Sequence, residues 1–195
     1  MTSRDQAWAA HDRDNPSAWS HRLPVIVLAL VGCGLATYLT LYQWHVTSSV
    51  WDPVFGSQSS EAVLTSFVSR LIPIPDATLG AIAYVIEAVL GAVGGSARWR
   101  AAPRLVLVFG AVLAGLALTS VALVLSQLLL VHALCTLCLG SAAISWINAW
   151  LGRDEVLASL ARVQETGARR STHHIRPGWP GESAAGPTQH QEEAQ

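Results

Sequence analysis

The chain has 195 residues, of which 51% are hydrophobic and 13% charged, and its formal net charge is −1. In soluble globular proteins about a quarter of the residues are charged, so this composition excludes most of them. The near-neutral balance itself says little about partners, and no nucleic-acid partner is expected. Because the apolar residues form blocks, the sequence predicts an integral membrane protein of the all-α class.

Residues 1–21 are polar and contain Pro16, and they are predicted to be a disordered cytoplasmic lead. Four apolar segments follow, and each is predicted to cross the bilayer as a helix, since about 20 mostly apolar residues span its hydrocarbon core. The first has no charged residue and is too long for the apolar core of a signal peptide. The predicted transmembrane segments are Leu23–Tyr42, Ala77–Val93, Leu105 to about Leu130, and Ala133–Leu151. Together they predict a four-helix membrane domain over residues 22–151.

A short helix is predicted in the loop between the first and second segments. Val63, Phe67 and Leu71 recur at helical spacing, Ser60 can serve as the N-cap, and Pro73 would end the helix. We interpret it as an outward-facing lid on the membrane, although an ordinary interfacial anchor fits the same periodicity.

After the fourth segment, residues 152–195 are predicted to form a cytoplasmic tail. It begins with a short amphipathic helix that contains Val156, Leu160 and Val163, and beyond Gly167 its composition indicates disorder. His173 and His174 are interpreted as part of this solvated tail.

The distribution of arginine predicts the topology, because cytoplasmic flanks are enriched in basic residues. The chain has no lysine, and the loop between the first and second segments contains a single arginine, Arg70. The other eleven lie before the first segment, between the second and third segments, and in the tail. A multi-pass protein of the plasma or inner membrane is therefore predicted, with both termini cytoplasmic. The Gln43–Asp76 loop and the start of the fourth segment then face outward.

Cys135 and Cys138 form a Cys-x-x-Cys pair at the outward start of the fourth segment. Residues three apart share a helix face, and the unpaired N–H groups of a first helical turn favour a thiolate, so the pair is suited to thiol–disulfide exchange. Zinc binding and simple packing of small thiols are the alternatives. Cys33, between two glycines in the first segment, is interpreted as a packing residue.

Two acidic residues lie in or beside the second segment. Glu87 is either a functional buried carboxylate or a partner of Arg98, Arg100 or Arg104, and the pairing is favoured. Asp76 is interpreted as an N-cap, with a ligand contact left open. Because the sequence contains no dinucleotide, haem or iron–sulfur motif, elimination leaves a bilayer-soluble quinone as the electron acceptor of a redox-active pair.

These features resemble the vitamin K epoxide reductase family. The similarity covers about residues 22–151 and includes the stretch from Ser60 to Ser66, then Pro75, Gly80 and Tyr84, and finally Cys135 to Cys138. The chain resembles a bacterial homologue that lacks the two loop cysteines of the family relay, since Ser60 occupies the place of the second. Ala142 stands where many members have a tyrosine.

The resemblance implies a four-helix bundle around a quinone of the menaquinone or ubiquinone type. It implies that Cys138 lies next to the quinone, that Cys135 exchanges with an incoming thiol, and that Asp76 and Ser66 contact the quinone. The implied activity is a membrane thiol–disulfide oxidoreductase that passes electrons between an extracytoplasmic thiol and the quinone. Its expected partners are membrane lipid and a secreted thioredoxin-like protein. The alternative is a non-catalytic membrane protein with a structural disulfide or a lipid- or quinone-binding role.

Overall fold

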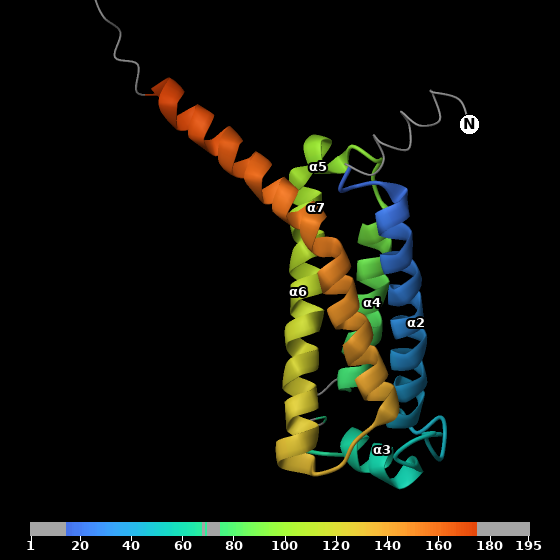
Figure 1. Ribbon diagram of the computed structural model, residues 1–195. Helices are drawn as coiled ribbons and strands as arrows, with labels where there is room; N and C mark the ends of the chain where they lie inside the picture. The colour runs from blue at the N-terminus through green and yellow to red at the C-terminus, as the bar shows by residue number, and fades with distance from the viewer. Residues whose placement is uncertain (1–14, 68, 70–74, 175–195) are drawn as a thin grey trace, which may run out of the picture.

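The computed structural model describes residues 15–67, 69 and 75–174, with side chains as far as residue 166, and this part of the chain is mostly helical (Figure 1). Most of the lead and the last part of the tail, together with Val68 and Leu71 of the predicted lid, lie outside the described residues. The elements in chain order are α2 (Trp19–Gln43), α3 (Ser57–Leu64), α4 (Asp76–Ala92), α5 (Arg98–Ala101), α6 (Pro103–Ser126), the π-helix η2 (Gln127–Val131) and α7 (Thr136–His174).

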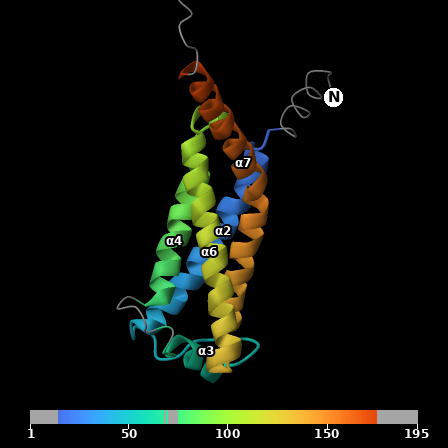
Figure 2. The same cartoon turned by 90° about the vertical axis from the view of Figure 1, so that its left-hand side faces the viewer.

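Helices α2, α4, α6 and α7 run side by side, and α3 lies across one end of them (Figures 1 and 2). Helix α2 packs on α4 and α7, and α6 packs on α7. By length and composition, two helices of the described chain can cross a membrane, Trp19–Gln43 and Pro103–Val131. Their mean hydropathies are 2.1 and 2.4, and many of their large apolar side chains face outward, as expected of a protein with lipid around it.

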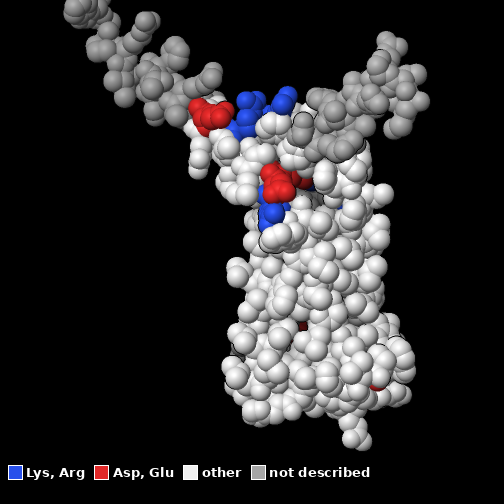
Figure 3. All heavy atoms as spheres, in the orientation of Figure 1, with Lys and Arg blue, Asp and Glu red and all other residues white. Residues whose placement is uncertain are grey.

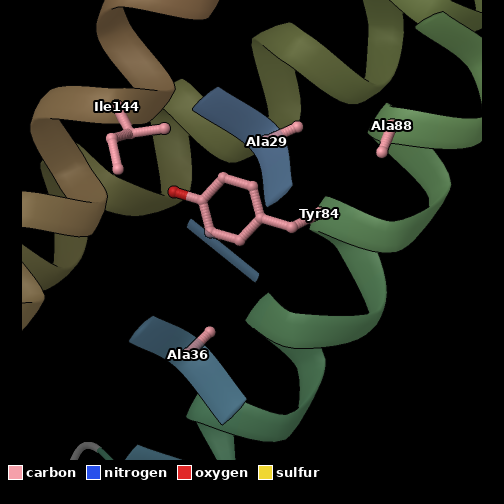
Figure 4. Packing of buried hydrophobic residues seen from close by; sticks show 5 residues of the cluster. All are labelled: Ala29, Ala36, Tyr84, Ala88 and Ile144. Atoms are coloured by element: carbon pink, nitrogen blue, oxygen red, sulfur yellow. The ribbon is translucent and has the colours of Figure 1, made fainter. Parts of the chain in front are cut away.

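Tyr84 occupies the centre of the contact between α2, α4 and α7 (Figure 4). The ring lies among Ala29, Ala36 and Ile144, and its side chain is only 3% exposed. It reaches α2 because Gly32 has no side chain, as a Cβ there would lie 2.7 Å from the ring. Small residues at this crossing therefore let the backbones approach closely, which is how helices pack in the absence of a hydrophobic driving force.

The chain reverses between α6 and α7 near His132, where the sequence predicts a hairpin. Helix α6 ends in the π-helical turn η2, and His132 adopts a left-handed backbone conformation with φ of 52°. The predicted fourth segment begins at Ala133, but α7 begins at Thr136 and leaves Cys135 in the connection that precedes it. The N-terminal N–H groups of α7 therefore lie beside Cys135.

Helix α3 differs from the predicted loop helix in both bounds. It begins at Ser57 after Gly56, whose φ of 80° favours glycine, and it ends at Leu64. Ser60, expected to be the N-cap, lies inside the helix with its side chain buried. Its hydroxyl donates to the Asp52 carboxylate, so it is not available to cap a helix end.

Helix α7 continues without a break through Leu151, where the sequence predicts a boundary between a transmembrane segment and a short tail helix. It also passes Gly167, beyond which disorder was expected, and it projects past the end of its neighbours (Figure 1). Gly152 does not end the helix, because it packs directly against Leu113 of α6. The contact is so close that a Cβ at residue 152 would lie 2.4 Å from Leu113 Cδ1. No proline interrupts the helix.

Charged side chains on the face shown in Figure 3 gather at the end where α5 and the middle of α7 lie. There Arg98 forms a buried bidentate ion pair with Glu155, with Nε–Oε1 and Nη2–Oε2 distances of 2.6 and 2.7 Å. Arg22 donates to the carbonyls of Val93 and Gly94 at 2.9 and 2.8 Å. Cations at the end of α4 thus satisfy carbonyls that have no partner within the helix.

Glu87 does not pair with Arg98, Arg100 or Arg104, so the favoured interpretation of this residue is wrong. Its side chain is fully buried, and its Oε1 accepts a hydrogen bond of 2.6 Å from Asn148 Nδ2. The same amide lies 3.3 Å from the Val25 carbonyl. Arg98 is engaged by Glu155 instead. Glu87 and Asn148 therefore form a polar connection between α2, α4 and α7 within the apolar interior.

Candidate functional site

The two cysteines lie together at the start of α7, where spacing predicts them. Cys135 precedes the helix and is fully buried, whereas Cys138 in the first turn is partly exposed. Both are free thiols, and the Cys138 backbone N–H donates to Cys135 Sγ at 3.2 Å. The two side chains share one face of the helix end, as exchange between a thiol and a disulfide form requires.

Cys135 is covered by side chains from three parts of the chain. Leu39 of α2, Val50 of the following loop, and Val63 and Leu64 of α3 form one buried cluster with it. Cys138 packs against the same cluster with part of its surface exposed. The loop and α3 therefore lie over the cysteine pair.

Asp52 joins this cover to the start of α7. Its Oδ2 accepts hydrogen bonds from the Ser60 hydroxyl and, at 2.8 Å, from the Thr136 backbone N–H. Its Oδ1 accepts from Thr136 Oγ1 at 2.6 Å, and from the backbone N–H groups of Val54 and Phe55 at 3.0 and 2.9 Å. Asp52 thus caps the N-terminus of α7 as an N-cap side chain would, although it lies 84 residues away from Thr136 in sequence.

The Asp52 carboxylate is held in its charged form. Burial alone would raise its pKa, but the hydrogen bonds from Ser60, Thr136 and Phe55 favour the anion and hold the pKa well below its usual range. A fixed negative charge therefore lies beside the Cys135 thiol.

Two more side chains fix the backbone around Cys135. Gln127, at the start of η2 and 3% exposed, accepts the Cys135 N–H at 3.1 Å through its Oε1. The Ser59 hydroxyl donates to the Leu134 carbonyl at 2.7 Å and accepts the Leu134 N–H at 3.0 Å. The backbone of Leu134 is therefore held by α3, and that of Cys135 by η2.

Neighbouring groups act on the pKa of the Cys135 thiol in opposite directions. Contact with the Cys138 thiol is the main one that holds the pKa of Cys135 below its ordinary value, and Ser60 and the Cys138 N–H act in the same direction. Burial and the negative charge of Asp52 act against it. The Cys135 thiol is thus activated by its neighbour in the pair and restrained by Asp52.

Asp76 is in the first turn of α4, and the N-cap position expected for it belongs to Pro75. Its Oδ1 accepts from Gln43 Nε2 at 2.6 Å and its Oδ2 accepts from the Ser69 hydroxyl at 3.2 Å. Ser66 is connected to this group, because its hydroxyl oxygen accepts the Ser69 backbone N–H at 3.5 Å. Asp76 and Ser66 are therefore joined through Ser69.

The Asp76 group and the cysteine pair border the same apolar cluster. Ala77, which follows Asp76, packs against this cluster from α4, and Cys138 does so from α7. Tyr38 and Tyr42 of α2 complete its rim. The structure thus brings the predicted residues Cys135, Cys138 and Asp76 to one end of the molecule, with Ser66 linked to Asp76 through Ser69.

Sequence reasoning missed Asp52, Ser59, Gln43 and Gln127. The run from Trp51 to Gly56 contains no cysteine, but it contains Asp52 directly before Pro53. An aspartate before a proline in a turn-rich stretch signals a side chain that bonds the backbone two or three residues later, as Asp52 does with Val54 and Phe55. The contact between Asp52 and Thr136 cannot be predicted from either stretch of sequence, because the two residues lie 84 positions apart.

A family model described as "Vitamin K epoxide reductase family" matches residues 23–152, more than half of the chain. The matched range includes both cysteines of the pair, Asp52 and Asp76. No curated protein matches the chain.

Proposed function

This chain belongs to the vitamin K epoxide reductase family, and on that basis we propose that it is a membrane thiol–disulfide oxidoreductase that uses Cys135 and Cys138. Electrons would pass between an extracytoplasmic thiol and a membrane quinone. The observation that carries the proposal is the placement of the pair: two free thiols in contact at a helix start, under a cover from α3 and its loop. Exchange chemistry needs this adjacency.

The thiol half of the reaction is a pair of exchange steps. A thiolate of the incoming partner attacks Cys135 Sγ of the Cys135–Cys138 disulfide, and Cys138 leaves as the thiolate. The second thiol of the partner then attacks the mixed disulfide, which releases the partner as a disulfide and Cys135 as a thiol. The two protons of the partner end on the cysteines. Because Cys135 is fully buried, the partner must displace part of the cover first.

The cluster beside Cys138 fits a quinone headgroup, which needs an apolar surface and hydrogen-bond partners for its oxygens. The surface is provided by Tyr38, Tyr42 and their neighbours. Ser66 accepts from Ser69 and retains its own hydroxyl proton to donate, whereas Asp76 can accept. We therefore propose that Ser66, Asp76 and Cys138 would hold the headgroup. A bound quinone would supply an acceptor for the two electrons and two protons released when the disulfide re-forms.

The proposed topology has four transmembrane helices, α2, α4, α6 and the first part of α7, over residues 22–151. The support comes from charge: Arg98 and Arg100 lie at the α5 end, which is where Figure 3 shows charged side chains, whereas α3 and the pair lie at the other end. Basic residues favour the cytoplasmic side. Residues 1–21 and 152–195 would then be cytoplasmic, and α3 would be an outward lid.

The partner proposed for the outward face is a secreted thioredoxin-like protein, with membrane lipid around the helices. The chain has no cysteine at Ser60 or in the Trp51–Gly56 run. The partner would therefore exchange with Cys135 directly, without a relay in the loop.

A second candidate function is a non-catalytic membrane protein that keeps the pair as a static disulfide. The observation that favours it is the complete burial of Cys135 together with the extended hydrogen-bond network of Asp52. Such a protein would bind a quinone or lipid without turning over.

Turnover distinguishes the two candidates. The purified protein in detergent would be given a soluble ubiquinone or menaquinone analogue and a small dithiol, and quinone reduction would be followed by absorbance. We expect the wild type and Cys33→Ala to turn over alike and Cys138→Ala to fall to the rate without protein. Equal rates for the wild type and Cys138→Ala would eliminate the oxidoreductase.

A further inference from the structure

We infer that Asp52 is a positioning residue that lowers the reduction potential of the Cys135–Cys138 pair, because it holds donors that would otherwise stabilise a Cys135 thiolate. This inference rests on the proposed function, since it concerns the redox equilibrium of the same pair. The geometry that carries it is the division of neighbouring hydrogen-bond donors between one carboxylate and one sulfur.

The donors in question belong to Thr136 and Ser60. The Thr136 N–H is at the N-terminus of α7, where an anion is favoured by unpaired N–H groups and by the helix dipole. A thiolate on Cys135 would be such an anion. Asp52 places another anion at this helix end, where it takes the Thr136 N–H at 2.8 Å and the Thr136 hydroxyl at 2.6 Å.

Ser60 is bound in the same way. Its side chain is fully buried in the cover and lies close enough to Cys135 to favour the thiolate there, but its hydroxyl has one proton, which it donates to Asp52 Oδ2. The Cys135 sulfur keeps the Cys138 backbone N–H at 3.2 Å. The donors around Cys135 are thus divided, with most of them assigned to the carboxylate.

The charges around the pair act in the same direction as this division. Among the residues that the structure describes, the acidic groups facing the cluster besides Asp52 are Glu61 of α3, whose Oε1 lies 3.4 Å from the Val50 N, and Asp76 of α4. Helix α2 contributes Tyr38 and Tyr42, and α7 contributes Cys138. Asp52 is the one that binds both Thr136 and Ser60 beside the cysteine, so its effect should exceed that of Glu61.

Thiolate stabilisation and redox potential are linked. A disulfide whose reduced form is stabilised is a stronger oxidant, so a group that withholds stabilisation from the thiolate makes the reduced pair a better electron donor. Asp52 therefore favours electron flow out of the pair and restricts its substrates to strongly reducing thiols. The exchange used to measure this is balanced: the protein disulfide and two glutathione thiols give the protein dithiol and glutathione disulfide.

The test uses the full-length chain in detergent, with Cys33→Ala in every variant so that only the pair reacts. Asp52→Asn removes the charge but keeps the shape. Glu61→Gln is the matched control, because it removes a charge from the same cover without altering the donors of Thr136. Each variant is equilibrated in glutathione buffers, quenched by alkylation, and its reduced fraction is read by mass spectrometry.

We expect Asp52→Asn to shift the equilibrium constant toward the reduced pair about tenfold, or about 30 mV, and Glu61→Gln to stay within about twofold of the wild type. In a Cys138→Ala background, Asp52→Asn should also move the pH midpoint of Cys135 alkylation downward. No shift with Asp52→Asn, or equal shifts in both variants, would overturn the inference.

Asp52→Ser provides a second variant in case the asparagine does not fold, because serine is an uncharged N-cap. It should move the equilibrium and the alkylation midpoint in the same direction. No quinone or turnover is involved in either measurement. A protein without quinone reductase activity can therefore still show the shift, and an active one can lack it, so failure of the inference and failure of the proposed function are distinguishable.

Discussion

The residues around Cys135 divide into those that a short sequence window reveals and those that only the fold brings there. Cys138 belongs to the first group, because its spacing from Cys135 defines both the motif and the contact. Asp52 belongs to the second, since its bonds to Thr136 join positions 84 residues apart. The sequence predicts Ser60 as an N-cap at a position where the family has a cysteine, whereas its hydroxyl donates to Asp52 and so joins α3 to the preceding loop without a disulfide.

The low pKa of Asp52 predicts a pH-dependent contribution to stability. A carboxyl group whose folded pKa is depressed stabilises the fold above its unfolded pKa of about 4, and this contribution is lost as the pH falls toward the folded value. Asp52→Asn should therefore lower the free energy of unfolding by about 1–3 kcal/mol at pH 7. The difference from the wild type should shrink below about pH 4. Thermal unfolding in detergent, followed by circular dichroism, measures it, and a difference independent of pH would contradict the prediction.

A cross-link tests the cover itself. Ser60 and Cys135 are both fully buried and share the neighbourhood of Asp52. In a Cys138→Ala background, Ser60→Cys should form a disulfide with Cys135 under mild oxidation, detected by non-reducing mass spectrometry, because a disulfide requires Cα atoms within about 7 Å. Gln58→Cys, exposed on the same helix, should not. If neither or both cross-linked, α3 would not have the predicted register over the pair.

At the scale of elements, hydropathy predicted where helices lie better than where they end. Helices α2, α4 and α6 lie over the predicted apolar segments, because apolar blocks of this length have few alternatives. Ends depend on partners outside the segment. Helix α7 continues past Leu151 because Gly152 packs directly against Leu113 of α6, where no larger residue would fit. Helix α3 begins at Ser57 because Gly56 permits a positive φ.

The connection between α4 and α7 leads to a prediction about Glu87. Glu87→Gln keeps an acceptor for the Asn148 amide, whereas Glu87→Ala leaves that buried amide without the partner now 2.6 Å away. We expect Glu87→Gln to unfold close to the wild type, and Glu87→Ala to lose about 1–3 kcal/mol in detergent unfolding. Equal losses for the two variants would mean that the side-chain volume, and not the hydrogen bond, joins the helices.

The buried ion pair at the α5 end makes a related prediction. Arg98→Ala would leave Glu155 buried without its cation, which typically costs about 3–5 kcal/mol. Arg100→Ala, two residues away and exposed, should change the unfolding free energy by less than about 1 kcal/mol. Chemical denaturation of both variants would measure this contrast, and similar values would show that the Arg98–Glu155 pair does not hold α5 to α7.

For the whole molecule, the proposed topology is open to direct labelling. Gln58→Cys at the α3 end and Ala97→Cys at the α5 end are exposed positions that can be compared in a chain otherwise free of cysteine. An impermeant maleimide applied to intact cells should label the first and not the second, since the basic end is placed in the cytoplasm. The reverse pattern would invert the molecule and expose Cys135 and Cys138 to a reducing compartment.

The unbroken course of α7 also matters for imaging. Its 39 residues correspond to about 58 Å of helix, roughly twice the hydrocarbon thickness of a bilayer. A protein of 20.8 kDa surrounded by a detergent micelle gives little contrast in electron cryomicroscopy. A carrier domain whose first helix continued α7 in register would be joined to the cysteine pair by one rigid rod, and its orientation would serve as a landmark for aligning the particle images.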